Sequence, residues 1–211
     1  MKGRKYLLAL AAVVTAAALF AVSASASSIL NWYFWTDGNG NVNAVNGQGG
    51  QFSVNWNGNG LFIAGKGWPQ GSPDRVIHYT ASDFQTNGNA YLMVYGWTRN
   101  PLVEYRVVDN WGNWRPVTAD YRGSVYSDGA WYDLYHAWRF NAPSPDGTQT
   151  FQQYWSVRQT KRPIGSRAAV TLEAHVKAWD NAGMSPGSRW AHQILAVEGG
   201  SGTGEASITV W

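Results

Sequence analysis

The chain contains no cysteine and only four histidines among its 211 residues. Without cysteine, it cannot form disulfides, thiolate nucleophiles, zinc–thiolate sites or iron–sulfur clusters. The histidines, His78, His136, His175 and His192, show none of the close paired spacings that hold a metal ion. We therefore expect a protein without a bound metal, whose fold depends on its core and its hydrogen bonds.

Charged residues are also few, and the basic excess lies at the N-terminus. Residues 1–26 contain Lys2, Arg4 and Lys5, the uncharged run YLLALAAVVTAAALFAV, and small residues at Ala24 and Ala26. This order is typical of a cleaved secretory signal peptide. A membrane anchor is the alternative, but the apolar run is short for a spanning helix and no basic cluster follows it. We predict a secreted, extracellular protein that does not remain in the membrane.

The remaining residues, 27–211, have the length of a single domain. The signal segment takes three of the 16 Lys and Arg residues and no acidic residue, which leaves 13 basic residues against 13 acidic ones. A formally neutral protein has no general attraction to nucleic acid or to an acidic membrane surface. No linker, repeat or second module is visible, and we expect a monomer.

Aromatic residues and glycine are abundant instead: 13 Trp, 11 Tyr, 7 Phe and 24 Gly. A small core cannot enclose so many rings, although an aromatic-rich core accounts for many of them. Some rings are therefore expected to line a surface. Flat rings with polar edges suit carbohydrate, because the C–H faces of a sugar stack on them.

Short segments of alternating polar and apolar residues fill most of the chain after the signal segment. They include NWYFW, QFSVNW, AYLMVYGWTR, VEYRVVDNW, YDLYHAWRF, TFQQYWSVRQ and WAHQILAVEG, separated by glycine-rich turns. This pattern predicts an all-β protein, either a β-sandwich or a jelly roll. One segment, Ala174–Ala182, has the spacing of a short helix, with Val176 and Trp179 against a sheet and Gly183 as its stop.

The segment RFNAPSPDGTQT joins two of these predicted strands. Pro143 and Pro145 stiffen it, and Asp146-Gly147 is typical of a tight turn. The pattern predicts a rigid hairpin tip, which is either a plain turn or a finger over a groove.

A carboxylate interrupts the predicted strand PLVEYRVVDN. Side chains alternate along a strand, so Val103, Tyr105 and Val107 share one apolar face, while Glu104 and Arg106 share the other. The charged face must meet water, a ligand or a cleft. An outward-facing ion pair on an edge strand, contributing about 0–1 kcal/mol, is one interpretation.

A second acid of the same kind favours a functional interpretation. Glu198 ends the apolar strand WAHQILAVEG, as Glu104 interrupts its own. Two acids set into apolar strands favour a shared polar site, because an unpaired buried carboxylate is costly. Enzymes that hydrolyse glycosidic bonds typically use a pair of carboxylic residues, here expected in an aromatic cleft.

Several motifs together carry a resemblance to a known family. In order, YFWTDGNG, SVNW, GKGW, YGWTRNPLVEY, VVDNWG, FNAPSPDG, QYWSVRQTKRP and WAHQILAVEG run from about Trp32 to Trp211. The chain resembles the family 11 glycoside hydrolases, the endo-β-1,4-xylanases. The resemblance implies a jelly roll of two curved, mostly antiparallel sheets with one short helix and a thumb hairpin at Pro143–Gly147.

The resemblance also implies roles for individual residues. Glu104 matches the family's nucleophile and Glu198 its acid/base, so that xylan would be hydrolysed with retention of anomeric configuration and without a cofactor. Further residues match positions that bind the substrate, xylan or xylo-oligosaccharides: Trp35, Tyr95, Arg139, Pro143 and Gln153.

Four positions depart from the family pattern. Arg106 and His192 stand where tyrosine is usual, Leu61 where Asn or Asp is usual, and Gly200 where tyrosine is usual. An opposite charge within about 4–6 Å lowers the pKa of a carboxyl by roughly 1–3 units. We expect Arg106 to lower the pKa of the acid/base Glu198 and Leu61 to raise it by desolvation. Because a close fixed charge usually outweighs one apolar contact, we expect the net effect to be a lowered pKa. We expect His192 and Gly200 to alter sugar contacts toward the ends of the cleft.

Three functions follow as alternatives. The first is an active endo-β-1,4-xylanase, and the second is a xylan-binding protein on the same fold whose catalysis Arg106 has weakened. The third is a β-glucan hydrolase on a related jelly roll.

Overall fold

The structure is a computed structural model that describes residues 30–118 and 120–211. The predicted signal peptide, residues 1–26, lies outside the described residues. Among the described residues, none of the helices is long and apolar enough to cross a membrane. The strands are β1 Asn31–Thr36, β2 Asn41–Asn46, β3 Gln51–Gly58, β4 Phe62–Trp68, β5 Val76–Arg99, β6 Val103–Trp111, β7 Asp120–Ser127, β8 Ala130–Ser144, β9 Gly147–Arg158, β10 Arg167–Thr171 and β11 Arg189–Val210, and the helix is α1 Leu172–Asn181.

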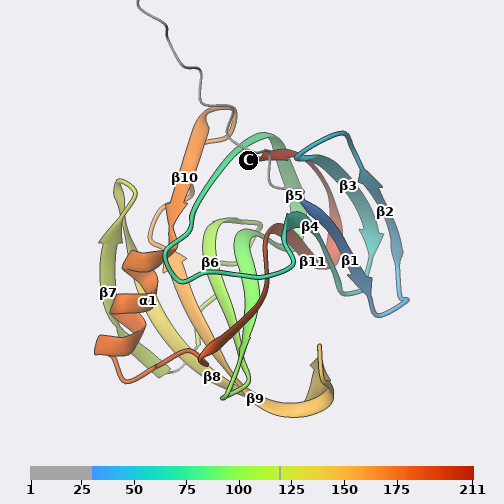
Figure 1. Ribbon diagram of the computed structural model, residues 1–211. Coiled ribbons are helices and arrows are strands. Elements are labelled where there is room, and N and C mark those ends of the chain that lie inside the picture. The colour runs from blue at the N-terminus through green and yellow to red at the C-terminus, as the bar shows by residue number, and fades with distance from the viewer. Residues whose placement is uncertain (1–29, 119) are drawn as a thin grey trace, which may run out of the picture.

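The strands form one strongly curved sheet, with α1 against its outer side near β7 (Figure 1). The strand order is β1-β4-β11-β5-β6-β9-β8-β7, with β3 pairing β11 and β2, and β10 pairing β5. All pairs are antiparallel except β6 with β9. The all-β jelly roll with one helix and a thumb hairpin is confirmed. The division into two sheets differs from the expectation, because hydrogen bonding is continuous.

Two long strands carry this continuity. β11 pairs with β4 over residues 193–199 and then with β3 over residues 202–209, while β5 stays beside it throughout. At the change of partner, Gly88 and Gly202 lie opposite one another with φ of +143° and +111°. A Cβ on Gly88 would lie 2.0 Å from the carbonyl oxygen of Ser201. Only glycine permits this approach and this conformation, which lets the strands turn from one layer into the next.

Alternation along the strands separates the core from the concave face. On β6, Val103, Tyr105 and Val107 are buried in the main core, as the sequence pattern predicts. On β5, Leu92 and Val94 point into the same core. The intervening residues of β5 and β6 point to the other side, where the site described below lies.

The helix begins two residues earlier than expected, at Leu172 rather than Ala174. Its start is held by Asp128 in the β7–β8 turn, whose carboxylate accepts hydrogen bonds from the backbone N and the Oγ1 of Thr171, each at 2.8 Å. This partner is distant in sequence, so the local pattern could not show it. Gly183 follows the helix with φ of +74°, as the predicted stop requires.

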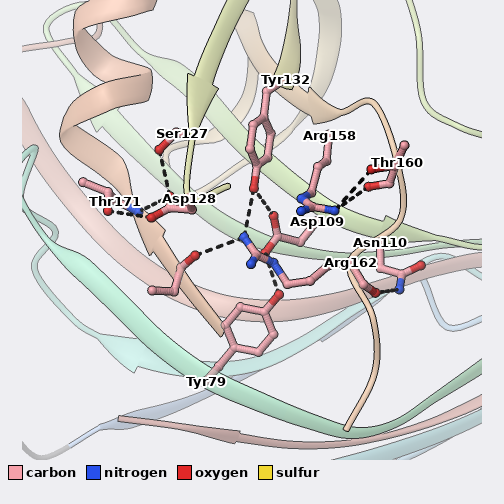
Figure 2. A network of polar contacts seen from close by, with 11 residues as sticks. Tyr79, Asp109, Asn110, Ser127, Asp128, Tyr132, Arg158, Thr160, Arg162 and Thr171 are labelled. Atoms are coloured by element: carbon pink, nitrogen blue, oxygen red, sulfur yellow. Dashed lines mark hydrogen bonds and ion pairs between the residues drawn. The ribbon is translucent and has the colours of Figure 1, made fainter. Parts of the chain in front are cut away.

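A buried acid on β6, Asp109, organises a polar network at the main core (Figure 2). Its carboxylate accepts hydrogen bonds from the hydroxyls of Tyr79 and Tyr132, both at 2.5 Å, and from Nε of Arg162 at 2.6 Å. Arg162 also donates to the carbonyl oxygen of Ala169 at 3.1 Å. Because the charge is paired and hydrogen-bonded, its burial is compensated, and the contacts tie β5, β6 and β8 to the segment before β10.

His175 on α1 lies beside this network without taking part in it. The side chain is fully buried, packs edge-on against Tyr132 at 4.8 Å between ring centroids, and has no hydrogen-bond partner on either ring nitrogen among the described residues. Burial lowers the pKa of His175 to about 4. In the unfolded chain the same group titrates near 6.5.

Acidification is therefore expected to destabilise the fold through His175. The unfolded chain takes up the proton first, so this stability is present above about pH 6.5 and is lost as the pH falls toward about 4. From about pH 7 to about pH 4.5, the loss is about 2–3 kcal/mol in the free energy of unfolding. Urea unfolding of the wild type and of His175→Leu measures it, with the exposed His78→Leu as control. An undiminished pH dependence in His175→Leu would contradict this account.

Candidate active site

A cleft of about 480 Å³ opens on the concave face of the sheet. It is lined by nine of the residues that the sequence indicates for the site: Trp35, Leu61, Tyr95, Glu104, Arg106, Arg139, Pro143, Gln153 and Glu198. His192 and Gly200 do not line it. Further aromatic rings line the cleft: Tyr33, Phe62, Tyr91, Trp97, Phe151 and Trp155. The cleft is thus acidic at its centre and aromatic around it.

The two glutamates come from strands on either side of β5. In the register of the sheet, Glu104 of β6 lies opposite Trp97, and Glu198 of β11 lies opposite Tyr91. Both side chains are mostly enclosed, with 6% of the Glu104 side chain and 17% of the Glu198 side chain exposed. The alternation that placed them on the cleft side of their strands also brings them together.

Arg106 lies between the two carboxylates and contacts both. Its Nη1 is 2.7 Å from Oε2 of Glu104, while Nη2 and Nε are 3.1 and 3.2 Å from Oε2 of Glu198. The Nη1 contact is an ion pair without hydrogen-bond alignment. The guanidinium also lies over the rings of Trp155 and Tyr95, at 4.5 and 5.2 Å from their centroids. Arg106 therefore does enter the cleft, as its shared face with Glu104 predicts.

Two neutral donors hold the other contacts of Glu104. The hydroxyl of Tyr95 donates to Oε1 at 2.9 Å, and the amide of Gln153 donates to Oε2. Trp97 donates from Nε1 to the Tyr95 hydroxyl oxygen at 2.7 Å, which leaves the Tyr95 proton free for Glu104. Burial, together with the charge of Glu104, raises the pKa of Tyr95 well above its usual value. Trp97 was missed as a positioning residue, although the YGW motif contains it.

Glu198 corrects one expectation about Arg106. Burial raises the pKa of Glu198 above its ordinary value, Arg106 opposes that rise, and Glu104 adds to it. The sequence predicts that the positive charge prevails, but the enclosure of the Glu198 carboxyl in the protein has the larger effect on its pKa. A raised pKa keeps a proton on this carboxyl at higher pH, which is what a general acid requires.

Leu61 contributes an apolar wall beside this acid. The side chain lines the cleft with Glu198 and is about half exposed at its rim. Gly200 adjoins it: a Cβ on Gly200 would lie 3.6 Å from Cδ2 of Leu61. Leu61 and Gly200 therefore lie together at one edge of the cleft.

His192 does not lie at an end of the cleft, which corrects a second expectation. It is stacked on Tyr33 at 4.6 Å and tilted against Tyr95 at 5.9 Å, behind the cleft wall. Burial lowers the pKa of His192 to about 4. Its ring contacts are with these two tyrosines, which line the cleft, whereas His192 itself does not line it.

The β8–β9 hairpin forms the thumb and bends away from the rest of the sheet (Figure 1). Arg139, Pro143 and Ser144 of this hairpin line the cleft. Its tip is held by Asp146, whose carboxylate accepts three hydrogen bonds of 2.6–2.9 Å from Arg99 at the end of β5. The hairpin is thus a finger over a groove, the second of the two predicted alternatives.

The cleft holds no evident metal site. In residues 30–118 and 120–211, no group of three or more His, Asp or Glu side chains is placed to bind a metal ion. The reactive groups of the described cleft are carboxylates, amide, hydroxyl and guanidinium.

Comparison with known proteins gives the same relatives by sequence and by structure. The chain is 52% identical over 178 residues to endo-1,4-β-xylanase 3 of Pyricularia oryzae, covering 83% of this chain and 74% of that protein. It is 49% identical over 193 residues to endo-1,4-β-xylanase 1 of Leucoagaricus gongylophorus, covering 88% of this chain and 82% of that protein. A solved structure from a comparison of two Trichoderma reesei endo-1,4-β-xylanases superposes with a TM-score of 0.80 at 38% identity, covering 86% of this chain and 98% of that one.

A family model extends the match over nearly the whole described chain. The model described as "Glycosyl hydrolases family 11" matches residues 27–209. That range contains every residue of the cleft described above. The chain belongs to glycosyl hydrolase family 11.

Proposed function

We propose that the protein is a secreted endo-β-1,4-xylanase that cleaves internal xylan linkages with retention of anomeric configuration. The observation that carries the proposal is the pair of enclosed glutamates in a ring-lined cleft, in a chain of this family. Its relatives are named endo-1,4-β-xylanases. The basic, apolar and small-residue segments of residues 1–26 support secretion.

The first chemical step divides between the two carboxyls. Glu198, whose pKa is raised by burial, donates its proton to the glycosidic oxygen. Glu104 attacks the anomeric carbon as the bond to the leaving sugar breaks, and a covalent xylosyl ester forms. Tyr95 and Gln153, which donate to Glu104, hold its attacking oxygen in place.

The second step releases the sugar. Glu198, now ionised, takes a proton from a water molecule, and that water attacks the anomeric carbon of the ester from the face the leaving group vacated. A retaining mechanism needs carboxyl groups roughly 5–5.5 Å apart. Contact of both carboxylates with one guanidinium supports such a close pair.

Release of reducing sugar from soluble xylan tests the proposal, with carboxymethyl cellulose as the comparison. We expect release from xylan and little from the cellulose derivative, because xylose lacks the hydroxymethyl group for which a narrow cleft has no room. Preferential release from the cellulose derivative would instead indicate a β-glucan hydrolase.

A second candidate function is a xylan-binding protein with weakened catalysis. The ion pairs between Arg106 and both glutamates favour this function. A carboxylate held in an ion pair attacks less readily, and a cation beside Glu198 favours the ionised form of this acid. Binding of xylan without release of reducing sugar would support this function over the first.

Stacking on Trp35 is expected to contribute to substrate affinity. Trp35 lies on β1 and lines the cleft. Trp35→Ala is expected to raise KM for short xylo-oligosaccharides. The rise should correspond to a loss of about 1–3 kcal/mol in binding free energy, the scale of stacking on aromatic rings in other open grooves. Phe34→Ala is the matched control, because Phe34 is comparably exposed and its ring stacks on Trp32. Unchanged KM and kcat in Trp35→Ala would show that this ring does not bind sugar.

A further inference from the structure

Aromatic residues remain exposed on the β7–β8 hairpin, outside the cleft. Tyr121 and Tyr126 of β7 are 56% and 60% exposed, and Trp131 of β8 is 50% exposed. None of them lines the cleft. Large exposed rings gathered on one element mark an interaction surface.

These rings lie on the same face of the sheet as the catalytic cleft. Across the sheet, Arg106 pairs with Trp155, Trp155 with Tyr135, and Tyr135 with Tyr121. Residues paired in this way project to one side, and Arg106 and Trp155 line the cleft. These four paired residues, Arg106, Trp155, Tyr135 and Tyr121, therefore lie on the cleft side of the sheet.

The same face continues along β8 to a second ring pair. Trp131 is four residues from Tyr135 on β8 and pairs with Tyr126 of β7, and the one irregularity in this stretch of the pairing lies on β7, between Tyr121 and Gly123. Four residues of strand span about 13 Å. The rings of Tyr126 and Trp131 contact each other edge-on, with centroids 5.5 Å apart.

Polar groups lie between the two sets of rings. Asp133 forms an ion pair of 2.7 Å with Arg115 and accepts a hydrogen bond of 2.8 Å from Gln159. The ion pair is partly open to solvent, with side-chain exposures of 24% for Arg115 and 16% for Asp133. Flat rings beside partly exposed charged and amide groups are the combination that binds a sugar, whose C–H faces stack while its hydroxyls form hydrogen bonds.

The opposite side of this hairpin is already covered. Val125 and Leu134, which alternate with the exposed rings, face the same side as α1: Leu134 belongs to the main core, and Val125 and Ala178 of the helix pack against that core. In Figure 1 the helix lies beside β7. The helix therefore explains the apolar residues on one side only, and the rings on the other side stay exposed within the part of the chain that the structure describes.

We propose that this face, centred on Tyr126 and Trp131, is a second contact surface for xylan. This surface would hold a segment of the polysaccharide outside the catalytic cleft. The identification of the polymer as xylan rests on the proposed function. The occupant is a carbohydrate chain because the face is continuous with the cleft and combines rings with hydrogen-bonding groups.

The double variant Tyr126→Thr/Trp131→Thr tests the surface, since threonine suits a strand and removes both rings. Adsorption to insoluble xylan is expected to fall about fivefold or more, the equivalent of one lost stacking contact. KM on polymeric xylan is expected to rise, while kcat/KM on short xylo-oligosaccharides stays at the wild-type value. Trp211→Thr, which removes an exposed ring elsewhere, is expected to leave all three quantities unchanged.

The possible outcomes separate this inference from the proposed function. Equal adsorption by a folded double variant, with wild-type hydrolysis of xylan, would overturn the second surface alone. Absence of both adsorption and hydrolysis in the wild type would overturn the proposed function with it.

A wild-type dimer that dissociates in the variant would overturn the inference by assigning the rings to self-association. If the double variant does not fold, the two single variants carry the same measurements, and unchanged adsorption in both would overturn the inference.

Discussion

Replacing Glu104 with glutamine is expected to abolish xylan hydrolysis while leaving xylan binding largely intact. Glutamine has nearly the same shape, and its oxygen can still accept the hydrogen bond from Tyr95, but it cannot form the covalent ester. Removal of a covalent nucleophile costs about four orders of magnitude or more in kcat in other hydrolases. Rates on soluble xylan and calorimetric titration with xylo-oligosaccharides measure the two effects.

Glu205→Gln is the matched control for this substitution. Glu205 lies on β11, the strand that carries Glu198, but it is exposed and outside the cleft. The same change of charge there is expected to leave kcat at the wild-type value. Activity near that of the wild type in Glu104→Gln would show that Glu104 is not the nucleophile.

Replacing Arg106 with tyrosine is expected to shift the pH–rate profile and to raise kcat. Arg106 is the group that opposes the raised pKa of Glu198. Removing it strengthens proton binding at Glu198, so the basic limb of the profile should move upward by about one to three pH units. Glu104 also loses an ion pair, which makes it a better nucleophile.

Arg106→Lys separates charge from shape in this test. Lysine keeps the cation but loses the planar fork that reaches both carboxylates. Its basic limb is expected to stay close to that of the wild type. If Arg106→Tyr leaves both kcat and the basic limb unchanged, or if Arg106→Lys shifts the limb equally, the charge of Arg106 does not tune the site.

Local alternation explains why much of the site could be predicted. The placement of Glu104 and Arg106 on one face and of Val103, Tyr105 and Val107 on the other follows from the two-residue period of a strand. The position of the thumb likewise follows from Pro143, Pro145 and the Asp146-Gly147 turn. These features depend on residues that are neighbours in the sequence.

Features that depend on distant residues could not be predicted in the same way. The direction of the pKa shift at Glu198 results from burial by several strands, which no single segment reveals. The continuous sheet results from partner changes along β11, and the network around Asp109 joins groups up to 53 positions away. His192, interpreted as a contact near the cleft ends, packs behind Tyr95 because its strand neighbours bury it there.

Trapping of the covalent intermediate tests the central claim most directly. A xylobioside with fluorine at C2 and a good leaving group forms the glycosyl ester but hydrolyses slowly, because fluorine destabilises both oxocarbenium-like transition states. Incubation is expected to raise the intact mass by one fluoroxylobiosyl group, and peptide mapping is expected to place that group on Glu104. A protein that stays unlabelled while it cleaves xylan, or a label on any other residue, would contradict the assignment of Glu104 as the nucleophile.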